Sequence, residues 1–154
     1  MMKIENWRTP AVILWCGALI LAVSLGIRHT FGLFLQPMSL DNGWGREAFA
    51  FAIALQNLVW GLAQPFAGRL ADRYGAGWAI LVGTLLYVAG LLLMAQSAST
   101  FGLALSAGVL IGLGLSGTTF PVVFGAVSRA VPPEQRSMAM GIAMAVGSLG
   151  QFVL

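Results

Sequence analysis

Charged side chains are scarce in this sequence of 154 residues: Asp, Glu, Lys and Arg make up 8%, whereas hydrophobic residues make up 58%. A soluble domain of average composition carries about 25% charged residues. One cysteine, Cys16, and one histidine, His29, offer neither a disulfide framework nor a cluster of metal ligands. The net charge is only +3, and the basic residues are spread over short segments. The composition therefore does not indicate a nucleic-acid partner.

Long apolar runs are abundant, and the short segments between them hold most of the charges. A helix needs ~20 apolar residues to cross ~30 Å of hydrocarbon. Only helices and closed barrels satisfy every backbone group inside a bilayer. These runs are too long for barrel strands and do not alternate strictly between polar and apolar residues. The sequence predicts an all-α, polytopic membrane bundle with helices at about 11–35, 47–67, 78–96, 101–127 and 137–154.

Basic residues gather in alternate connecting segments. Six lie on one side of the predicted membrane: Lys3, Arg8, Arg69, Arg73, Arg129 and Arg136. The other side holds Arg46 alone. Because loops rich in Lys and Arg stay in the cytoplasm, we expect a cytoplasmic N-terminus. The expected location is the bacterial inner membrane. The first run is too long for a cleaved signal peptide and leads into further apolar runs.

Arg28 lies inside the first apolar run. An arginine in a spanning helix is costly and usually faces a cavity or a partner. Its planar fork suits a carboxylate, and Ser24 lies one turn away on the same face. Arg28 lies about 26 Å along the helix from its start. The alternative is therefore that its long side chain reaches the lipid headgroups.

The second apolar run carries Gln56, Trp60 and Gln64 at intervals of four residues, with Asn57 beside them. This polar stripe suits a wet cavity, although hydrogen bonding between helices would also explain it. The predicted substrate-binding set consists of Arg28, Ser24, Gln56, Trp60 and Gln64. His29 is a candidate proton relay, since histidine titrates near neutral pH; a structural, hydrogen-bonded histidine is the alternative.

The sequence contains no nucleophile–base pair and no phosphate-cradling loop, so we predict neither an enzyme nor a bound cofactor or metal.

Small residues recur at intervals of four in several apolar runs. Such spacing lets helix backbones approach closely. The residues concerned are Ala18, Ala22 and Gly26, Gly108 and Gly112, and Ala143 and Gly147.

The segment between the second and third predicted helices reads GRLADRYGAGW over residues 68–78. Gly68 and Gly75 are expected to supply the backbone freedom that a short reversal needs. Asp72 is expected to accept backbone N–H groups at the start of the next helix. Arg73 is expected to pair with a carboxylate or with lipid phosphates.

This segment resembles the loop motif G-x-x-x-D-R-x-G of the major facilitator superfamily, which is cytoplasmic and lies between helices two and three. Gly77 and Trp78 stand where the family usually has basic residues. Residues 31–34 and 43–46 resemble the first helix and first outer loop of the oxalate–formate and monocarboxylate porter branch. Residues 141–151 are similar to the glycine-rich fifth helix of that branch.

The resemblance implies twelve helices in two halves, a substrate site near the midplane, alternating access and a cytoplasmic latch at the 68–75 loop. Residues 1–154 would then be an incomplete N-terminal transmembrane domain. Its partners would be the bilayer, a small organic anion and the missing C-terminal half. A transporter of a monocarboxylate-like anion is the leading hypothesis. Efflux of lipophilic drugs and a non-transporting helical membrane subunit are the alternatives.

Overall fold

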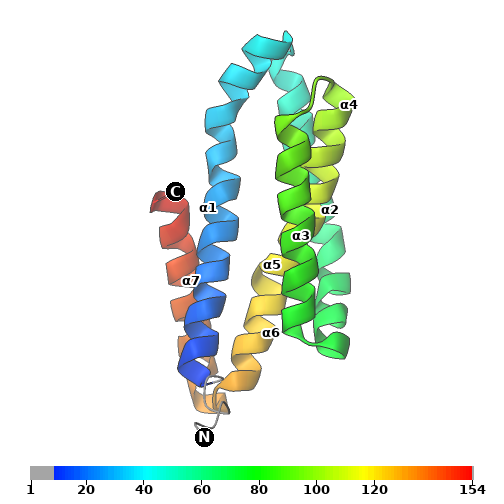
Figure 1. Cartoon of the computed structure of the whole chain (residues 1–154). Coiled ribbons are helices and arrows are strands. Elements are labelled where there is room, and N and C mark those ends of the chain that lie inside the picture. The colour runs from blue at the N-terminus through cyan, green and yellow to red at the C-terminus, as the bar shows by residue number, and fades with distance from the viewer. Residues whose placement is uncertain (1–8, 154) are drawn as a thin grey trace, which may run out of the picture.

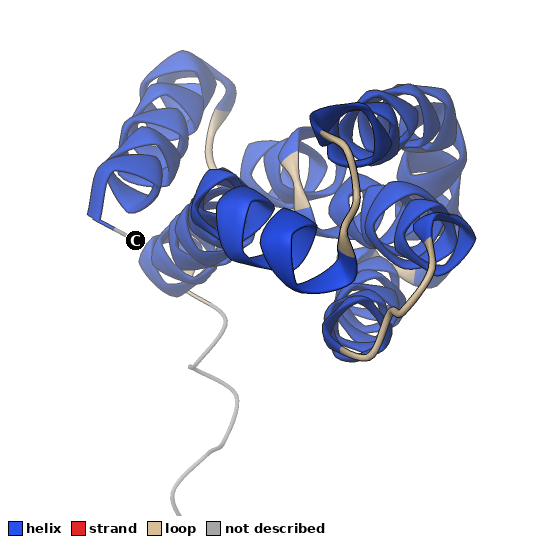
Figure 2. Cartoon of the chain, turned by 90° about the horizontal axis from the view of Figure 1, so that it is seen from above, coloured by secondary structure: helices blue, strands red, loops and turns tan. Residues whose placement is uncertain are grey.

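The computed structural model describes residues 9–153, and over this range the chain is helical and contains no strand (Figures 1 and 2). This confirms the predicted all-α bundle. The first helix, α1, spans Pro10–Asn42. It begins where the Thr9 side chain accepts the N–H of Val12 at 3.3 Å, which satisfies one of the free donors of the first turn. It ends at Gly43, whose φ of 64° is left-handed.

The next two helices, α2 (Arg46–Tyr74) and α3 (Ala76–Ala95), are separated by one residue. That residue is Gly75, with a φ of 93° that residues with a side chain rarely adopt. Both α1 and α2 continue beyond their predicted ends at residues 35 and 67. The reason is that the apolar run marks the part of a helix that suits lipid, whereas the helical backbone extends farther into polar sequence.

The fourth predicted helix consists of four elements: α4 (Thr100–Leu103), the π-helix η2 (Ala104–Leu110), α5 (Ile111–Thr118) and α6 (Phe120–Ala130). It is interrupted at Thr119, whose backbone is extended. Pro121 lacks a backbone N–H and its ring would clash with the preceding turn, so a regular helix does not pass through this point. The span predicted over 101–127 is present as Thr100–Ala130, with an interruption at Thr119.

After a short 3-10 turn, η3 (Pro133–Gln135), the last described helix is α7 (Arg136–Val153). In Figure 1, α7 stands beside α1, whereas α2, α3 and α4 stand together on the other side. α1 packs on α7 and α6, and α5 with η2 packs on α2 and α3. The broken fourth span thus reaches from one group of helices to the other, because α6 leaves α5 and contacts α1.

Glycines allow very close approach of helices at two contacts. A Cβ added to Gly117 of α5 would lie 2.7 Å from the carbonyl oxygen of Ala79 and 2.9 Å from the Cα of Gly83, both in α3. At the contact of α7 with α1, a Cβ on Gly147 would lie 3.2 Å from the Cβ of Leu21. The predicted role of small residues in close packing is observed at Gly147.

Large apolar side chains cover much of the outer surface. Four helical stretches are long and apolar enough to cross a membrane: Pro10–Leu33, Arg46–Tyr74, Ala76–Ala95 and Thr100–Ala130. Leu33 is 75% exposed and Phe101 77% exposed. Soluble monomers rarely leave contiguous apolar patches of this kind in water, so lipid is the fitting surrounding. Lys3 and Arg8, which contribute to the predicted orientation, lie outside the described residues.

Candidate functional site

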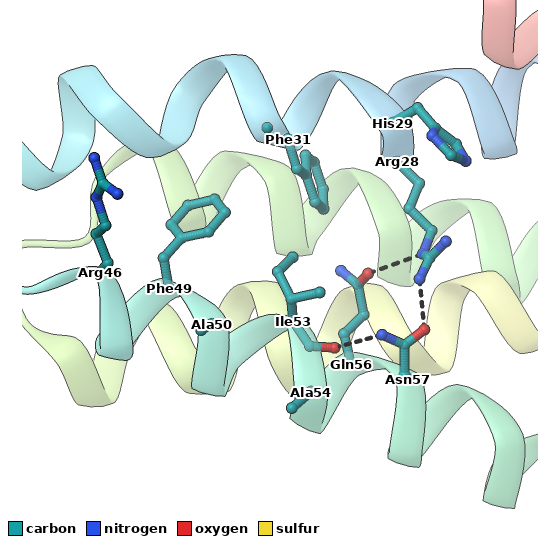
Figure 3. Close-up of a pocket in the computed structure, with 11 residues that line it drawn as sticks. Arg28, His29, Phe31, Arg46, Phe49, Ala50, Ile53, Ala54, Gln56 and Asn57 are labelled. Carbon is teal, nitrogen blue, oxygen red and sulfur yellow. Dashed lines mark hydrogen bonds between the residues drawn. The ribbon is translucent and has the colours of Figure 1, made fainter.

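A pocket of about 630 Å³ lies between α1 and the first half of α2. Figure 3 shows its lining, with apolar side chains such as Phe31, Phe49 and Ile53 along the walls. Arg28 and His29 line one end of the pocket and Arg46 lines the other. No Asp or Glu is among the described residues that line it. The pocket therefore combines an apolar wall with an excess of positive charge.

The Arg28 guanidinium reaches from α1 to α2 and is held there by two amides (Figure 3). Its Nε donates to Oε1 of Gln56 at 3.3 Å, and its Nη2 donates to Oδ1 of Asn57. Its Cζ lies 5.1 Å from the ring centre of Trp60, within the range of a cation–π interaction. Among the described residues, Nη1 of Arg28 has no hydrogen-bond partner, so this nitrogen is available to a ligand.

The depth of the cluster follows from its place on α2. Gln56 comes ten residues after Arg46, the first residue of α2, which corresponds to about 15 Å along the helix axis. Gln56 is also near the middle of the apolar run predicted over 47–67. Because Arg28 bonds to α2 at this level, its guanidinium lies beside the apolar part of α2 and not at the end of that helix.

Trp60 is oriented by a second contact. Its indole N–H donates to the hydroxyl of Thr119 at 2.9 Å, at the break between α5 and α6. Thr119 in turn donates to the carbonyl of Leu115 at 2.6 Å. The break in the fourth span therefore supports the aromatic ring under Arg28. Local sequence reasoning did not find this contact, because Trp60 and Thr119 are far apart in the chain.

Of the predicted binding residues, the structure brings Arg28, Gln56 and Trp60 together, with Asn57 as an addition. It does not bring Ser24 and Gln64 to them. Ser24 is buried, and its backbone carbonyl accepts a hydrogen bond from the hydroxyl of Tyr87 at 2.9 Å. Both residues line a separate pocket. Gln64 lies about 12 Å beyond Gln56 along the axis of α2 and does not line the Arg28 pocket.

The segment over residues 68–75 differs from the prediction. Asp72 lies in the last turns of α2 and α3 begins at Ala76, so Asp72 does not cap α3. Instead it pairs with Arg129, at the end of α6, with an oxygen–nitrogen distance of 2.9 Å. Gly68 is inside α2 and supplies no turn, whereas Gly75 does, as predicted. The Arg73 guanidinium lies 5.4 Å from the ring centre of Tyr74.

Comparison with known proteins identifies the family. The sequence model described as "Major Facilitator Superfamily" matches residues 14–154. A relative from Arabidopsis thaliana, named "Probable anion transporter 4, chloroplastic", is 34% identical over 139 residues, which cover 88% of this chain and 26% of the relative. The "Uncharacterized MFS-type transporter YhjX" of Escherichia coli is 30% identical over 112 residues, 73% of this chain and 28% of the relative.

A third relative has a different name. The "Multidrug resistance protein MdtH" of Yersinia enterocolitica is 31% identical over 134 residues, which cover 86% of this chain and 33% of the relative. The chain thus spans about a quarter to a third of the length of these relatives. All three are named as transport or resistance proteins, in agreement with the prediction that the chain is not an enzyme. With its apolar helices, this integral, multi-pass membrane chain belongs to the Major Facilitator Superfamily.

Proposed function

We propose that the complete gene product is a secondary transporter of a small organic anion, of the monocarboxylate kind, that works by alternating access. The observation that carries the proposal is the Arg28 guanidinium, which is held beside the middle of α2 with Nη1 facing no described partner. A guanidinium has five N–H donors, so it can hold the two amide oxygens and still donate charged hydrogen bonds to a carboxylate. The name of the Arabidopsis relative supports an anion as substrate.

The lining of the pocket supports the same substrate class. It contains Arg28 and Arg46 and, among the described residues, no carboxylate. A pocket lined by one sign of charge with apolar walls raises the local concentration of ions of the opposite sign. Phe31 and Phe49 offer an apolar surface to the carbon body of a small acid. His29 lines the same pocket and is our candidate for a proton relay.

Transport in vesicles tests the proposal. The complete gene product, reconstituted in proteoliposomes, is loaded with unlabelled substrate and given radiolabelled formate, lactate or oxalate outside. We expect counterflow of at least one of these carboxylates and none of the lipophilic cation tetraphenylphosphonium. Counterflow of the cation alone would contradict the proposal and favour drug efflux, which the name of the Yersinia relative supports. Movement of none of them would favour a non-transporting subunit.

We propose that the protein lies in the inner membrane of a bacterium, with its N-terminus in the cytoplasm. In a background without Cys16, single cysteines at Asn42 and Ser97 are expected to react with a membrane-impermeant maleimide added to intact cells. A cysteine at Ala76 is expected to react only after the membrane is opened. Labelling of the Ala76 cysteine in intact cells would reverse the orientation.

We also propose that Asp72 belongs to a latch that joins the two halves of the transporter on the cytoplasmic side. Its ion pair with Arg129 joins the ends of α2 and α6, and both side chains are more than half exposed. Exposed pairs contribute only about 0–1 kcal/mol to stability, so the protein is expected to fold without it.

Asp72→Asn is therefore expected to slow transport turnover, while substrate affinity changes much less because the pair is far from the Arg28 pocket. Counterflow rates and affinities of the variant are compared with those of Glu134→Gln, which removes an exposed carboxylate from η3. Normal turnover of Asp72→Asn would contradict the latch role and leave residues 68–75 as a simple connection between α2 and α3.

A further inference from the structure

Gln56 is fully buried although its amide carries two donors and one acceptor. A buried amide without hydrogen bonds is strongly destabilising, so the partners of Gln56 decide how its side chain is oriented. On one side, Nε2 donates to the carbonyl of Ala107 at 2.8 Å. On the other side, Oε1 accepts from Nε of Arg28 at 3.3 Å. The amide thus connects the π-helix η2 to the arginine.

The chemistry of the two partners allows only one orientation of this amide. The Ala107 carbonyl can only accept, and the Arg28 guanidinium can only donate. If the amide were turned over, its oxygen would face the carbonyl and its NH₂ group would face the guanidinium, so both hydrogen bonds would be lost. Gln56 therefore presents an acceptor to Arg28 for as long as its Nε2 stays on Ala107.

Asn57 has the same polarity. Its Nδ2 donates to the carbonyl of Ile53 at 2.8 Å, on its own helix, and its Oδ1 accepts from Nη2 of Arg28. Nε and Nη2 are thus both occupied by amide oxygens from α2, and the Nη1 side of the guanidinium is left for a ligand. Figure 3 shows the guanidinium above the two amides, with both dashed contacts directed toward α2.

The carbonyl that anchors Gln56 belongs to a helix with an unusual register. Ala107 lies in the π-helix Ala104–Leu110, after which the N–H of Ile111 donates to the carbonyl of Ser106, five residues earlier. Single π-turns inside helices frequently occur at functional sites. Gly108 and Gly112 leave room for α2 at this place, since a Cβ on Gly112 would lie 2.9 Å from the carbonyl oxygen of Gln56.

From these contacts we propose that Gln56 is a positioning residue: through the Ala107 carbonyl it fixes the orientation of the Arg28 guanidinium, so that Nη1 is presented to the carboxylate. The inference rests on the proposed function, because it assumes that Arg28 receives the substrate. Gln56 itself need not touch the substrate. Its removal should therefore weaken carboxylate binding at Arg28.

A double-mutant cycle separates positioning from simple helix packing. Equilibrium binding of radiolabelled lactate, with formate and oxalate in parallel, is measured for the wild type, Gln56→Met, Arg28→Lys and the double variant of the complete gene product. We expect Gln56→Met to weaken binding about five- to tenfold in the wild-type background. In the Arg28→Lys background, which has no fork to orient, we expect it to change binding by less than about twofold.

Three outcomes are informative. Equal losses in both backgrounds would mean that Gln56 only holds α2 against η2, and no loss in the wild-type background would remove its role altogether; both overturn the inference. Wild-type affinity of Arg28→Lys alone would instead overturn the proposed function, and the inference with it. Gln56→Leu is tested beside Gln56→Met in case one variant fails to fold. Gln64→Met serves as the control for loss of an amide from α2, because Gln64 does not line the Arg28 pocket.

Discussion

Arg28→Gln is expected to weaken binding of small carboxylates about ten- to a hundredfold. The reason is that a hydrogen bond to a charged group contributes roughly 1.5–3 kcal/mol, and each 1.4 kcal/mol corresponds to about a factor of ten in affinity. Glutamine keeps a polar side chain, but it is shorter than arginine and lacks both the charge and the fork. Loss of the cation also removes its attraction to the ring of Trp60, 5.1 Å away.

Arg28→Lys distinguishes geometry from charge. Lysine keeps the positive charge but carries its three N–H donors on one nitrogen, so it cannot present two parallel N–H groups to a carboxylate. In the wild type, separate nitrogens of Arg28 donate to Gln56 and Asn57. The single nitrogen of lysine cannot occupy these positions and the position of Nη1 at the same time. We expect binding clearly weaker than that of the wild type and stronger than that of Arg28→Gln.

Binding or counterflow of radiolabelled lactate, at matched expression in the membrane, measures both effects. Arg69→Gln is the control for loss of an exposed cation, since Arg69 lies over Phe66 in the second half of α2. If Arg28 instead reached the headgroups, lysine would replace it almost freely, because both side chains have long apolar stems. Equal binding by the wild type, Arg28→Gln and Arg28→Lys would remove the anion site from this half of the protein.

Gly117→Ala is expected to destabilise the bundle strongly for a change of one methyl group. The added Cβ would lie 2.7 Å from the carbonyl oxygen of Ala79 and 2.9 Å from the Cα of Gly83. Both neighbours are backbone atoms of α3, so relief requires α3 and α5 to move apart. Overpacking of this kind typically costs about 1–3 kcal/mol. Trp60 and Arg28 would also be disturbed, because Thr119 follows Gly117 by two residues and holds the Trp60 indole.

Gly141→Ala is the matched control for this substitution. Gly141 lies in α7, and a Cβ there would meet nothing within 4 Å, so alanine is expected to be neutral or slightly stabilising through its higher helix propensity. The thermal unfolding midpoint in detergent and the fraction of monodisperse protein are compared for the two variants. Equal midpoints would contradict the close packing of Gly117 against Ala79 and Gly83.

The helices and part of the site could be predicted because their signals are local. Arg28 is conspicuous as a charge in an apolar run, and Gln56 and Trp60 share one face of a helix because they are four residues apart. Asn57, one position on, points about 100° away in an ideal helix. It meets Arg28 nevertheless, because an arginine side chain is long enough to reach both amides.

What could not be predicted depends on how distant segments pack. Asp72 and Arg129 are 57 positions apart, and only the arrangement of α2 and α6 brings them together. Ser24 shares a face with Arg28, but α3 covers it through the hydroxyl of Tyr87. The π-register of η2 has no signal in its apolar, small residues, although it contains the carbonyl that anchors Gln56. Gly68 resembles a turn glycine, yet the helix continues past it to Tyr74.

The central claim, that Arg28 receives the carboxylate, is tested most directly by an experimental structure of the complete gene product with lactate bound. We expect a carboxylate oxygen about 2.7–2.9 Å from Nη1 of Arg28, the usual length of a charged hydrogen bond. Nε and Nη2 are expected to remain on Gln56 and Asn57. Lactate bound elsewhere, with the Arg28 guanidinium turned toward the lipid headgroups, would contradict the claim.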